Sequence, residues 1–447
     1  MKKYSSLKSS HFAHEKKNLS RRELIKILGS GALSYGLFGA SSFASTNAAA
    51  HIVIVGGGIG GAASAKYMRL LNADVKITII EPNPQFIFCP GSNEIIPGWA
   101  TIEEYTVTYT TLKERYHVNV IHDKAEHINF SKKQLKLDGG DTLQYDKLIV
   151  SPGPTYFYEG IEGYNQQLAE GDFPAAWHTG PQTINLRNQL LSMKKGGHAI
   201  ISVPADPYRC PPAPYERASF ITTMLKKINP GAKVTILDAK NSFIFDNIFP
   251  VYWKKHFGYG TDNSMLEWIS KDKGGEVVKL DAKDHAVITA DGTVHKGDVI
   301  NIIPPEKAAA FALKNDLADG DWCPVNFKDF SSTKHKDIYV IGDSVAGDPM
   351  PKTGFLASNE ARVVVQAIND ELHGREVGTP FLINGCVAMA GLDFGMTLSE
   401  TFRYQGKGMP LAERYFIPEP TDSPQKQLVL ANMARNWQRT FRKDIFS

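Results

Sequence analysis

The chain has 447 residues, of which 42% are hydrophobic and 22% are charged, a composition typical of a globular protein. The net charge of +3 is small, and no basic stripe with interleaved aromatic residues occurs, so nucleic-acid binding is not expected. The length allows two or three domains of about 150 residues each.

Residues 1–50 have the pattern of a twin-arginine export signal. Arg21 and Arg22 precede a short apolar run broken by glycines, and small residues follow. The run is too short for a permanent membrane anchor. We therefore expect cleavage between Ala44 and His51 and a periplasmic protein without an integral membrane segment; the alternative is an amphipathic surface helix.

A dinucleotide fingerprint begins at residue 51. An apolar strand leads into Gly56, Gly58 and Gly61, and a helix and a second strand follow, ending at Glu81. The glycines allow a tight turn and close approach of a pyrophosphate, and the acid can hold ribose hydroxyls. Residues 51–163 are predicted to form the first segment of an FAD-binding domain.

Residues 198–239 repeat this strand, turn, helix and strand plan, and residues 164–300 are predicted to form a second domain. Its turn reads "VPADPYRCPPAPYERAS" and contains no glycine, so it cannot hold a pyrophosphate, and NAD(P)H is not expected as the electron donor. Cys210 precedes the helix, whose dipole is expected to lower the pKa of the thiol. Glu216, six positions after Cys210, is expected to transfer protons, and the alternative is that it only complements the charge of the helix N-terminus. An inert buried cysteine is the alternative.

Residues 301–376 are predicted to complete the FAD-binding domain. A buried strand ends at Gly342 and Asp343, and a long helix starts near Gly354; in this pattern the aspartate binds the ribitol chain of FAD. Lys352, just before this helix, is also predicted to bind the cofactor. The predicted fold is α/β, with two Rossmann-like domains as in glutathione reductase and a smaller C-terminal α+β domain at residues 377–447.

Several further segments identify a family. The chain resembles the flavoprotein subunit of flavocytochrome c sulfide dehydrogenase, a relative of the sulfide:quinone oxidoreductases, at "VGGGIGGA", "FCPGSNEII", "YRCPPAPYERAS", "WCPVN", "IGDSVAGDPMPKTG" and "NWQRTFRKDIFS". The resemblance implies a redox disulfide between Cys210 and Cys386, acid/base catalysis by Glu216 and flavin stacking by Trp437. Taken on its segment alone, Cys386 would be a core cysteine.

The resemblance also implies a covalent bond between Cys89 and FAD, although Pro90 and Gly91 depart from the family pattern at the next two positions. Cys323 has no catalytic counterpart and is interpreted as a structural thiol. None of the four cysteines forms a C-x-x-C pair, so neither a metal site nor a c-type haem is expected in this chain.

The implied activity is sulfide oxidation. Hydrosulfide would attack Cys210, form a persulfide and release Cys386 as a thiolate, with Glu216 handling protons. Electrons would pass singly from FAD to haem c on a small c-type cytochrome subunit docked near residues 377–447. The alternatives are a sulfide:quinone oxidoreductase at the membrane surface and an accessory flavoprotein of a thiosulfate-oxidising complex.

Overall fold

The computed structural model describes residues 49–417 and 422–447. The export signal was predicted for residues 1–50, and residues 1–48 of it lie outside the described residues. Across the two described ranges, no helix combines the length and the apolar character that crossing a bilayer requires.

A seven-stranded sheet forms the first domain, in the order β19-β20-β21-β9-β1-β2-β5. Its central strands are parallel and buried on both faces, which explains their continuous apolar sequences. Its strands are β1 (His51–Val55), β2 (Lys76–Ile80), β5 (Asn119–Ile121), β9 (Lys147–Val150), β19 (Val325–Asn326), β20 (Ser331–Ser332) and β21 (Ile338–Val340). Since β21 pairs with β9, two segments distant in sequence build one sheet.

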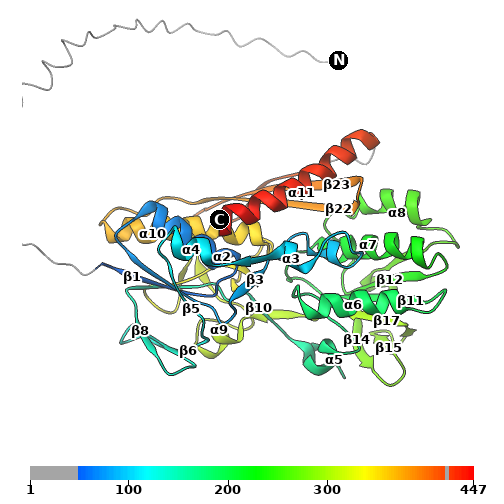
Figure 1. Cartoon of the computed structure of the whole chain (residues 1–447), viewed down its shortest axis with the longest axis horizontal. Coiled ribbons are helices and arrows are strands. Elements are labelled where there is room, and N and C mark those ends of the chain that lie inside the picture. Colours follow the sequence, from blue (N-terminus) through cyan, green and yellow to red (C-terminus); the bar gives the residue numbers. More distant parts are fainter. Residues whose placement is uncertain (1–48, 418–421) are drawn as a thin grey trace, which may run out of the picture. The chain divides into compact units, whose positions relative to one another are not determined.

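Helices α2 (Ile59–Leu71) and α10 (Gly354–Leu372) pack side by side on this sheet (Figure 1). The small elements around the sheet are β3 (Gln85–Ile87), η1 (Ser92–Ile95), α3 (Ile102–Tyr105), β4 (Thr106–Thr108), α4 (Thr110–Glu114), β6 (Ala125–Asn129), β7 (Gln134–Leu137), β8 (Thr142–Gln144), β10 (Pro154–Tyr156), η2 (Tyr158–Gly160), β18 (Glu306–Ala308), α9 (Ala310–Lys314) and η4 (Gly342–Ser344).

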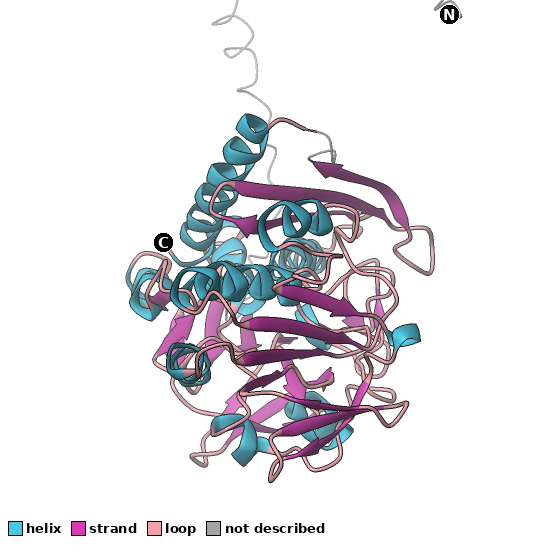
Figure 2. Cartoon of the chain, turned by 90° about the vertical axis from the view of Figure 1, so that its right-hand side faces the viewer, coloured by secondary structure: helices cyan, strands magenta, loops and turns pink. Residues whose placement is uncertain are grey.

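The middle domain has a parallel four-stranded sheet in the order β13-β12-β11-β17, whose strands Figure 2 shows from the side of this domain. The elements of the domain are α5 (Gln166–Glu170), α6 (Pro181–Ser192), β11 (His198–Val203), α7 (Ala213–Ile228), β12 (Lys233–Asp238), α8 (Phe249–Phe257), β13 (Leu266–Ile269), η3 (Lys271–Lys273), β14 (Val277–Asp281), β15 (Ala286–Thr289), β16 (Val294–Lys296) and β17 (Val299–Ile302). Strand β17 spans the predicted boundary between residues 300 and 301. With the first domain, this second parallel sheet confirms the predicted two-domain α/β fold.

The C-terminal part is an antiparallel sheet of β22 (Phe381–Gly391), β23 (Phe394–Arg403) and β24 (Leu411–Ile417), followed by α11 (Pro424–Phe446). Helix α11 runs beside β22 and β23 and continues to α2 of the first domain (Figure 1).

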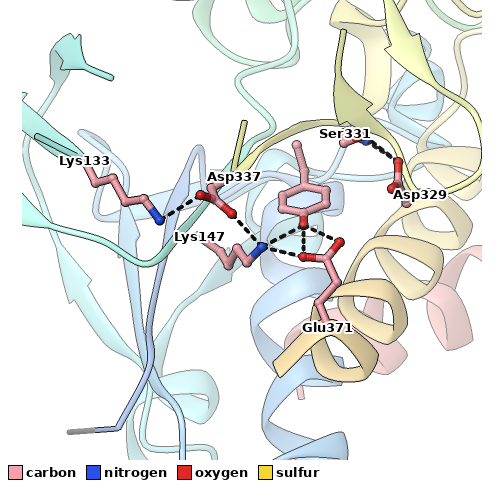
Figure 3. A network of polar contacts seen from close by, with 7 residues as sticks. Lys133, Lys147, Asp329, Ser331, Asp337 and Glu371 are labelled. Atoms are coloured by element: carbon pink, nitrogen blue, oxygen red, sulfur yellow. Dashed lines mark hydrogen bonds and ion pairs between the residues drawn. The ribbon is translucent and has the colours of Figure 1, made fainter. Parts of the chain in front are cut away.

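An ion-pair network joins the opening residues of two strands to α10 (Figure 3). Lys147 on β9 contacts Asp337, which precedes β21, at 2.7 Å and also pairs with Glu371 on α10. Lys133 reaches Asp337 at 2.7 Å from the turn before β7. The network holds the sheet at the end opposite to the carboxyl ends of its parallel strands.

Candidate active site

A cavity of about 610 Å³ lies at the carboxyl ends of the strands of the first domain, where ligands bind in open α/β sheets. Its lining includes residues from both predicted nucleotide turns and from the segment after β3. Among them are the predicted site residues Gly56, Gly58, Glu81, Cys89, Cys210, Glu216, Gly342 and Asp343.

The fingerprint turn has the geometry that its glycines predict. Gly56 has φ +97°, and a Cβ on Gly61 would lie 1.9 Å from the Gly56 carbonyl oxygen, so neither position tolerates a side chain. Gly58 is the N-cap of α2, where backbone N–H groups are available to an anion. Glu81 accepts a 2.9 Å hydrogen bond from Gly57 N.

The second predicted FAD segment provides an unsatisfied acceptor. Asp343 Oδ1 is buried and has no hydrogen-bond partner among the described residues, and burial raises the pKa of this carboxyl group. A ligand hydroxyl group would satisfy it. Together with the glycine cradle and the cavity volume, this acceptor fits FAD, which Gly56, Gly58, Glu81 and Asp343 would hold.

Lys352 and Trp437 do not line the cavity. The Lys352 ammonium donates to the carbonyl oxygens of Asp343 and Val345, both at 2.8 Å. It therefore stabilises the loop that carries Asp343 without lining the cavity itself. Trp437 on α11 packs against Phe355 and Phe441, with ring centroids at 5.5 and 5.1 Å.

Cys89 lines the cavity in the turn between β3 and η1. Burial raises the pKa of its thiol, while the charge of Arg209 acts in the opposite direction. The turn is covered by α11, because a Cβ on Gly91, which has φ +83°, would lie 2.3 Å from Gln438 Oε1. Glycine after the Cys89-Pro90 pair therefore allows the C-terminal helix to approach the cysteine.

Cys210 lies in the glycine-free turn of the middle domain, with φ +59°, a conformation that non-glycine residues seldom adopt. Its backbone N–H donates to Lys352 O at 2.9 Å and so ties this turn to the first domain. The expectation of a lowered pKa is wrong. Burial raises the pKa of Cys210 well above its usual value, and the charges of Cys386 and Glu216 raise it further. Helix α7 begins only at Ala213, so the thiol is not in its first turn.

Cys386 lies on β22 and packs with Cys210 against the same apolar core. Burial and the charges of Glu216 and Glu400 raise its pKa to about 12. It does not line the cavity, unlike Cys210. Both residues are free thiols, as are Cys89 and Cys323, so the predicted disulfide is not formed in this structure.

Glu216 is a buried carboxylate at the junction of three elements. From α7 it accepts hydrogen bonds from Asn93 Nδ2 at 2.8 Å and from Met389 N at 2.9 Å. Burial raises its pKa to about 7, although both hydrogen bonds act to lower it. A carboxyl group that titrates near neutral pH is suited to proton transfer.

Two arginines of the site were not among the predicted residues. Arg209 and Arg217 both line the cavity. Arg209 donates to Tyr156 Oη at 3.0 Å, and Arg217 donates to Asn301 Oδ1 at 2.9 Å. Both arginines could have been predicted from the segment "YRCPPAPYERAS", because each is the sequence neighbour of a predicted catalytic residue.

A polar cluster lies where β12 of the middle domain ends. Asp238, which is fully buried, accepts hydrogen bonds from Tyr215 Oη at 2.6 Å and Trp268 Nε1 at 2.9 Å, and its ion pair with Lys240 measures 2.7 Å. The Tyr215 ring stacks on Phe243 at 3.6 Å. Asp238 ends its strand as Glu81 follows β2 in the first domain, but its oxygens are occupied by side chains of this chain.

Comparisons with known proteins support the fold and indicate a sulfide-oxidising family. The family model for the central part of the sulfide dehydrogenase [flavocytochrome c] flavoprotein chain matches residues 183–304. The model for pyridine nucleotide-disulphide oxidoreductases matches residues 50–185.

Among curated relatives, the sulfide-quinone reductase of Aquifex aeolicus is 26% identical, over 79% of this chain and 84% of that protein. A sulfide dehydrogenase [flavocytochrome c] flavoprotein chain from Chlorobaculum thiosulfatiphilum is 48% identical over 44 residues, which cover 10% of this chain and 92% of that sequence. The solved sulfide:quinone oxidoreductase of Aquifex aeolicus covers 89% of this chain and 92% of its own, with a TM-score of 0.69 and 21% identity, and so shares its fold.

The two sheets, the first parallel at its centre and the second parallel throughout, and the cavity define a flavoprotein with two dinucleotide-binding domains. Within that class, the chain belongs to the sulfide-oxidising flavoproteins, and the pyridine nucleotide-disulphide oxidoreductase family implies FAD as the cofactor.

Proposed function

We propose that the protein oxidises sulfide through Cys210 and Cys386 and that its electrons leave one at a time to a small c-type cytochrome subunit. The observation that carries the catalytic part is the position of Glu216, a cavity-lining carboxylate hydrogen-bonded to the strand of Cys386 and six residues after Cys210.

The thiols act in their oxidised, disulfide form. Hydrosulfide attacks Cys210 Sγ, so a new S–S bond forms while the bond between Cys210 and Cys386 breaks. Cys386 leaves as a thiolate, and the sulfur of sulfide, now oxidised by two electrons, remains as a persulfide on Cys210. Glu216 takes the persulfide proton. FAD, when bound, would accept the two electrons that become available when the bond between Cys210 and Cys386 re-forms and the persulfide sulfur leaves, and it can be discharged in single-electron steps.

Anaerobic stopped-flow mixing with sulfide tests the role of the thiols. Cys210→Ser and Cys386→Ser should retain FAD but slow its bleaching by at least about 100-fold, because neither variant can form the disulfide. Cys323→Ala, which changes a buried thiol outside the cavity, is the matched control. Bleaching at the control rate in either serine variant would overturn the assignment.

Cys89 is proposed to bind FAD covalently through its sulfur. Its place in the cavity lining supports this, as does the family resemblance. Denaturing gel electrophoresis should show flavin fluorescence in the protein band, and Cys89→Ala should abolish it. Fluorescence that leaves the wild-type band on denaturation would exclude the bond.

The acceptor proposal rests on the family model for flavocytochrome c chains and on the Chlorobaculum relative. It includes a periplasmic location and a cytochrome docked near residues 377–447.

A sulfide:quinone oxidoreductase is the second candidate, because the Aquifex sulfide-quinone reductase matches most of the chain. The experiment that separates the two candidates compares sulfide-dependent reduction of a small c-type cytochrome with sulfide-dependent reduction of a short-chain ubiquinone. Turnover with the quinone alone, and recovery in the membrane fraction, would favour the second candidate. Bleaching without turnover to either acceptor would favour an accessory flavoprotein.

A further inference from the structure

Three polar residues cross the C-terminal sheet in register. Asn384 on β22 lies opposite Glu400 on β23, which lies opposite Arg414 on β24. Asn384 Nδ2 donates to Glu400 Oε2 at 2.7 Å, and Arg414 Nε donates to Glu400 Oε1 at 2.8 Å. We call these three residues the cross-strand ladder.

The inner part of the ladder is buried. Asn384 is 0% exposed and Glu400 is 1% exposed, whereas the Arg414 side chain remains 37% exposed at the outer strand. Burying a carboxylate is costly unless it is paired and hydrogen-bonded, and here both Glu400 oxygens have partners. The sheet therefore holds a buried negative charge whose counter-charge comes from its edge.

At its inner end, the ladder contacts the first domain. Thr353 Oγ1 donates to Asn384 Oδ1 at 2.8 Å and accepts from Leu356 N at 3.1 Å, so the same hydroxyl group caps α10. The hydrogen bonds thus run from the N-terminus of α10, which borders the cavity at Gly354, to the outer edge of the molecule's C-terminal sheet.

Cys386 lies beside this ladder. Because side chains two residues apart in a strand share a face, Cys386 and Asn384 point to the same side of β22. Cys386 is paired with Leu398, so Glu400 is its diagonal neighbour, at roughly 7–8 Å by general sheet geometry. The other ionisable groups facing the thiol are Glu216 on α7 and Cys210.

We propose that Asn384, Glu400 and Arg414 are positioning residues that hold Cys386 against α10 and set its reactivity through the charge balance between Glu400 and Arg414. The proposal rests on the redox role proposed for Cys386. It predicts that neutralising either end of the ion pair changes the thiol in opposite directions, because Glu400 disfavours the thiolate and Arg414 offsets that effect.

The test is the rate at which iodoacetamide alkylates Cys386 in the reduced holoprotein, read by peptide mass spectrometry between pH 6 and 10 without sulfide. Glu400→Gln should alkylate roughly three- to tenfold faster than wild type at pH 7, since one pKa unit is tenfold in thiolate. Arg414→Gln should alkylate more slowly by a similar factor, and the double variant should return to within about twofold of wild type.

Controls separate charge from loss of structure. Arg414→Lys keeps the charge and should stay near wild type, and Glu413→Gln removes an exposed carboxylate at the neighbouring position and should change nothing. If both ladder variants alkylate faster, the ladder only holds the strand in place and the charge proposal is wrong. Equal rates in all variants would also overturn it.

If Cys386 resists iodoacetamide, the smaller thiol reagent methyl methanethiosulfonate is used over the same pH range, again without sulfide. Modification should then be fastest in Glu400→Gln and slowest in Arg414→Gln, and the reverse order would contradict the proposal. Because alkylation needs no sulfide, failure of the ladder is distinguishable from failure of the sulfide reaction, which Cys386→Ser tests.

Discussion

Glu216 combines parts of the chain that are far apart in sequence. Its two hydrogen-bond partners, Asn93 and Met389, are 123 and 173 residues away, and each belongs to a different element. Burial dominates its electrostatics and raises its pKa to about 7, so the group changes charge within the pH range where sulfide itself ionises.

This pKa predicts a pH dependence for sulfide-driven bleaching. Below about pH 7 the carboxyl group is protonated and cannot accept the persulfide proton, and above it the carboxylate can. With hydrosulfide held at constant concentration, the wild-type rate should therefore rise as pH increases through about 7. Glu216→Gln should be slower by about 10²–10⁴-fold and flat over this range. A wild-type pH profile in the variant would assign the ionisation to another group.

Single residues also mark where sequence reasoning stops. The glycines, Glu81 and Asp343 were predictable because strand-end turns impose local geometry. Cys386 was assigned only through the family resemblance, since its own segment reads as a core strand. The ladder beside it was not predictable, because the pairing of Asn384 with Glu400 depends on the strand register, which no turn residue in that segment specifies.

At the scale of elements, the two domains use the same strand, turn and helix plan for different purposes. In the first domain, the glycine turn leaves the N-terminus of α2 open to a ligand. In the middle domain, Tyr215, Trp268 and Lys240 surround Asp238 at the end of β12. The missing glycines predicted that the second site would not bind a nucleotide. They did not predict the side chains that occupy it.

The Asp238 cluster should make a large contribution to the stability of the middle domain. Asp238→Ala removes the counter-charge of Lys240, whose ammonium keeps its hydrogen bond to Pro204 O, and it removes the acceptor of Tyr215 Oη and Trp268 Nε1. We therefore expect a loss of about 3–5 kcal/mol in the free energy of unfolding. Thermal and denaturant unfolding measure it. Asp246→Asn, at an exposed position, should change stability by less than about 0.5 kcal/mol. Equal effects would show that the cluster is not stabilising.

The network around Lys147 links β9, β21 and α10, and its contribution depends on pH (Figure 3). Burial opposes ionisation of Asp337, but Lys133 and Lys147 outweigh it, and its pKa is lowered from the usual 3.8. The stabilisation is therefore present above about pH 4 and is lost as pH falls through the lowered pKa.

Lys147→Gln should consequently cost about 1–3 kcal/mol of unfolding free energy at pH 7. The difference from wild type should shrink below pH 4, where Asp337 becomes protonated in both proteins. Urea unfolding at pH 7 and pH 3 measures it. A difference that stays constant between the two pH values would show that Lys147 acts by packing instead of charge.

At the scale of the whole molecule, α11 joins the C-terminal sheet to the first domain. Gly395 on β23 accommodates the helix backbone at one end, since a Cβ there would lie 2.2 Å from Ala431 N. At the other end, Lys66 on α2 donates to the carbonyl oxygens of Asp444 and Ser447 at 2.6 and 2.7 Å. The family resemblance implied that Trp437 of this segment stacks on the flavin. It could not predict the anchor on α2, because that contact joins residues more than 370 positions apart.

The end of α11 should control the stability of the segment that carries Cys89. Phe446 is 3% exposed and stacks on Phe86 at 5.5 Å, and Phe86 itself lines the cavity, three residues before Cys89. Phe446→Ala should cost about 3–5 kcal/mol, the usual result of removing a buried aromatic ring. It should also speed hydrogen exchange at the backbone amides of β3. Met433→Ala, which truncates an exposed side chain on the same helix, should change neither quantity beyond about 0.5 kcal/mol. If exchange in β3 is unchanged while global stability falls, Phe446 supports the fold without holding the cysteine segment, and the link from the C-terminal helix to the flavin cavity is wrong.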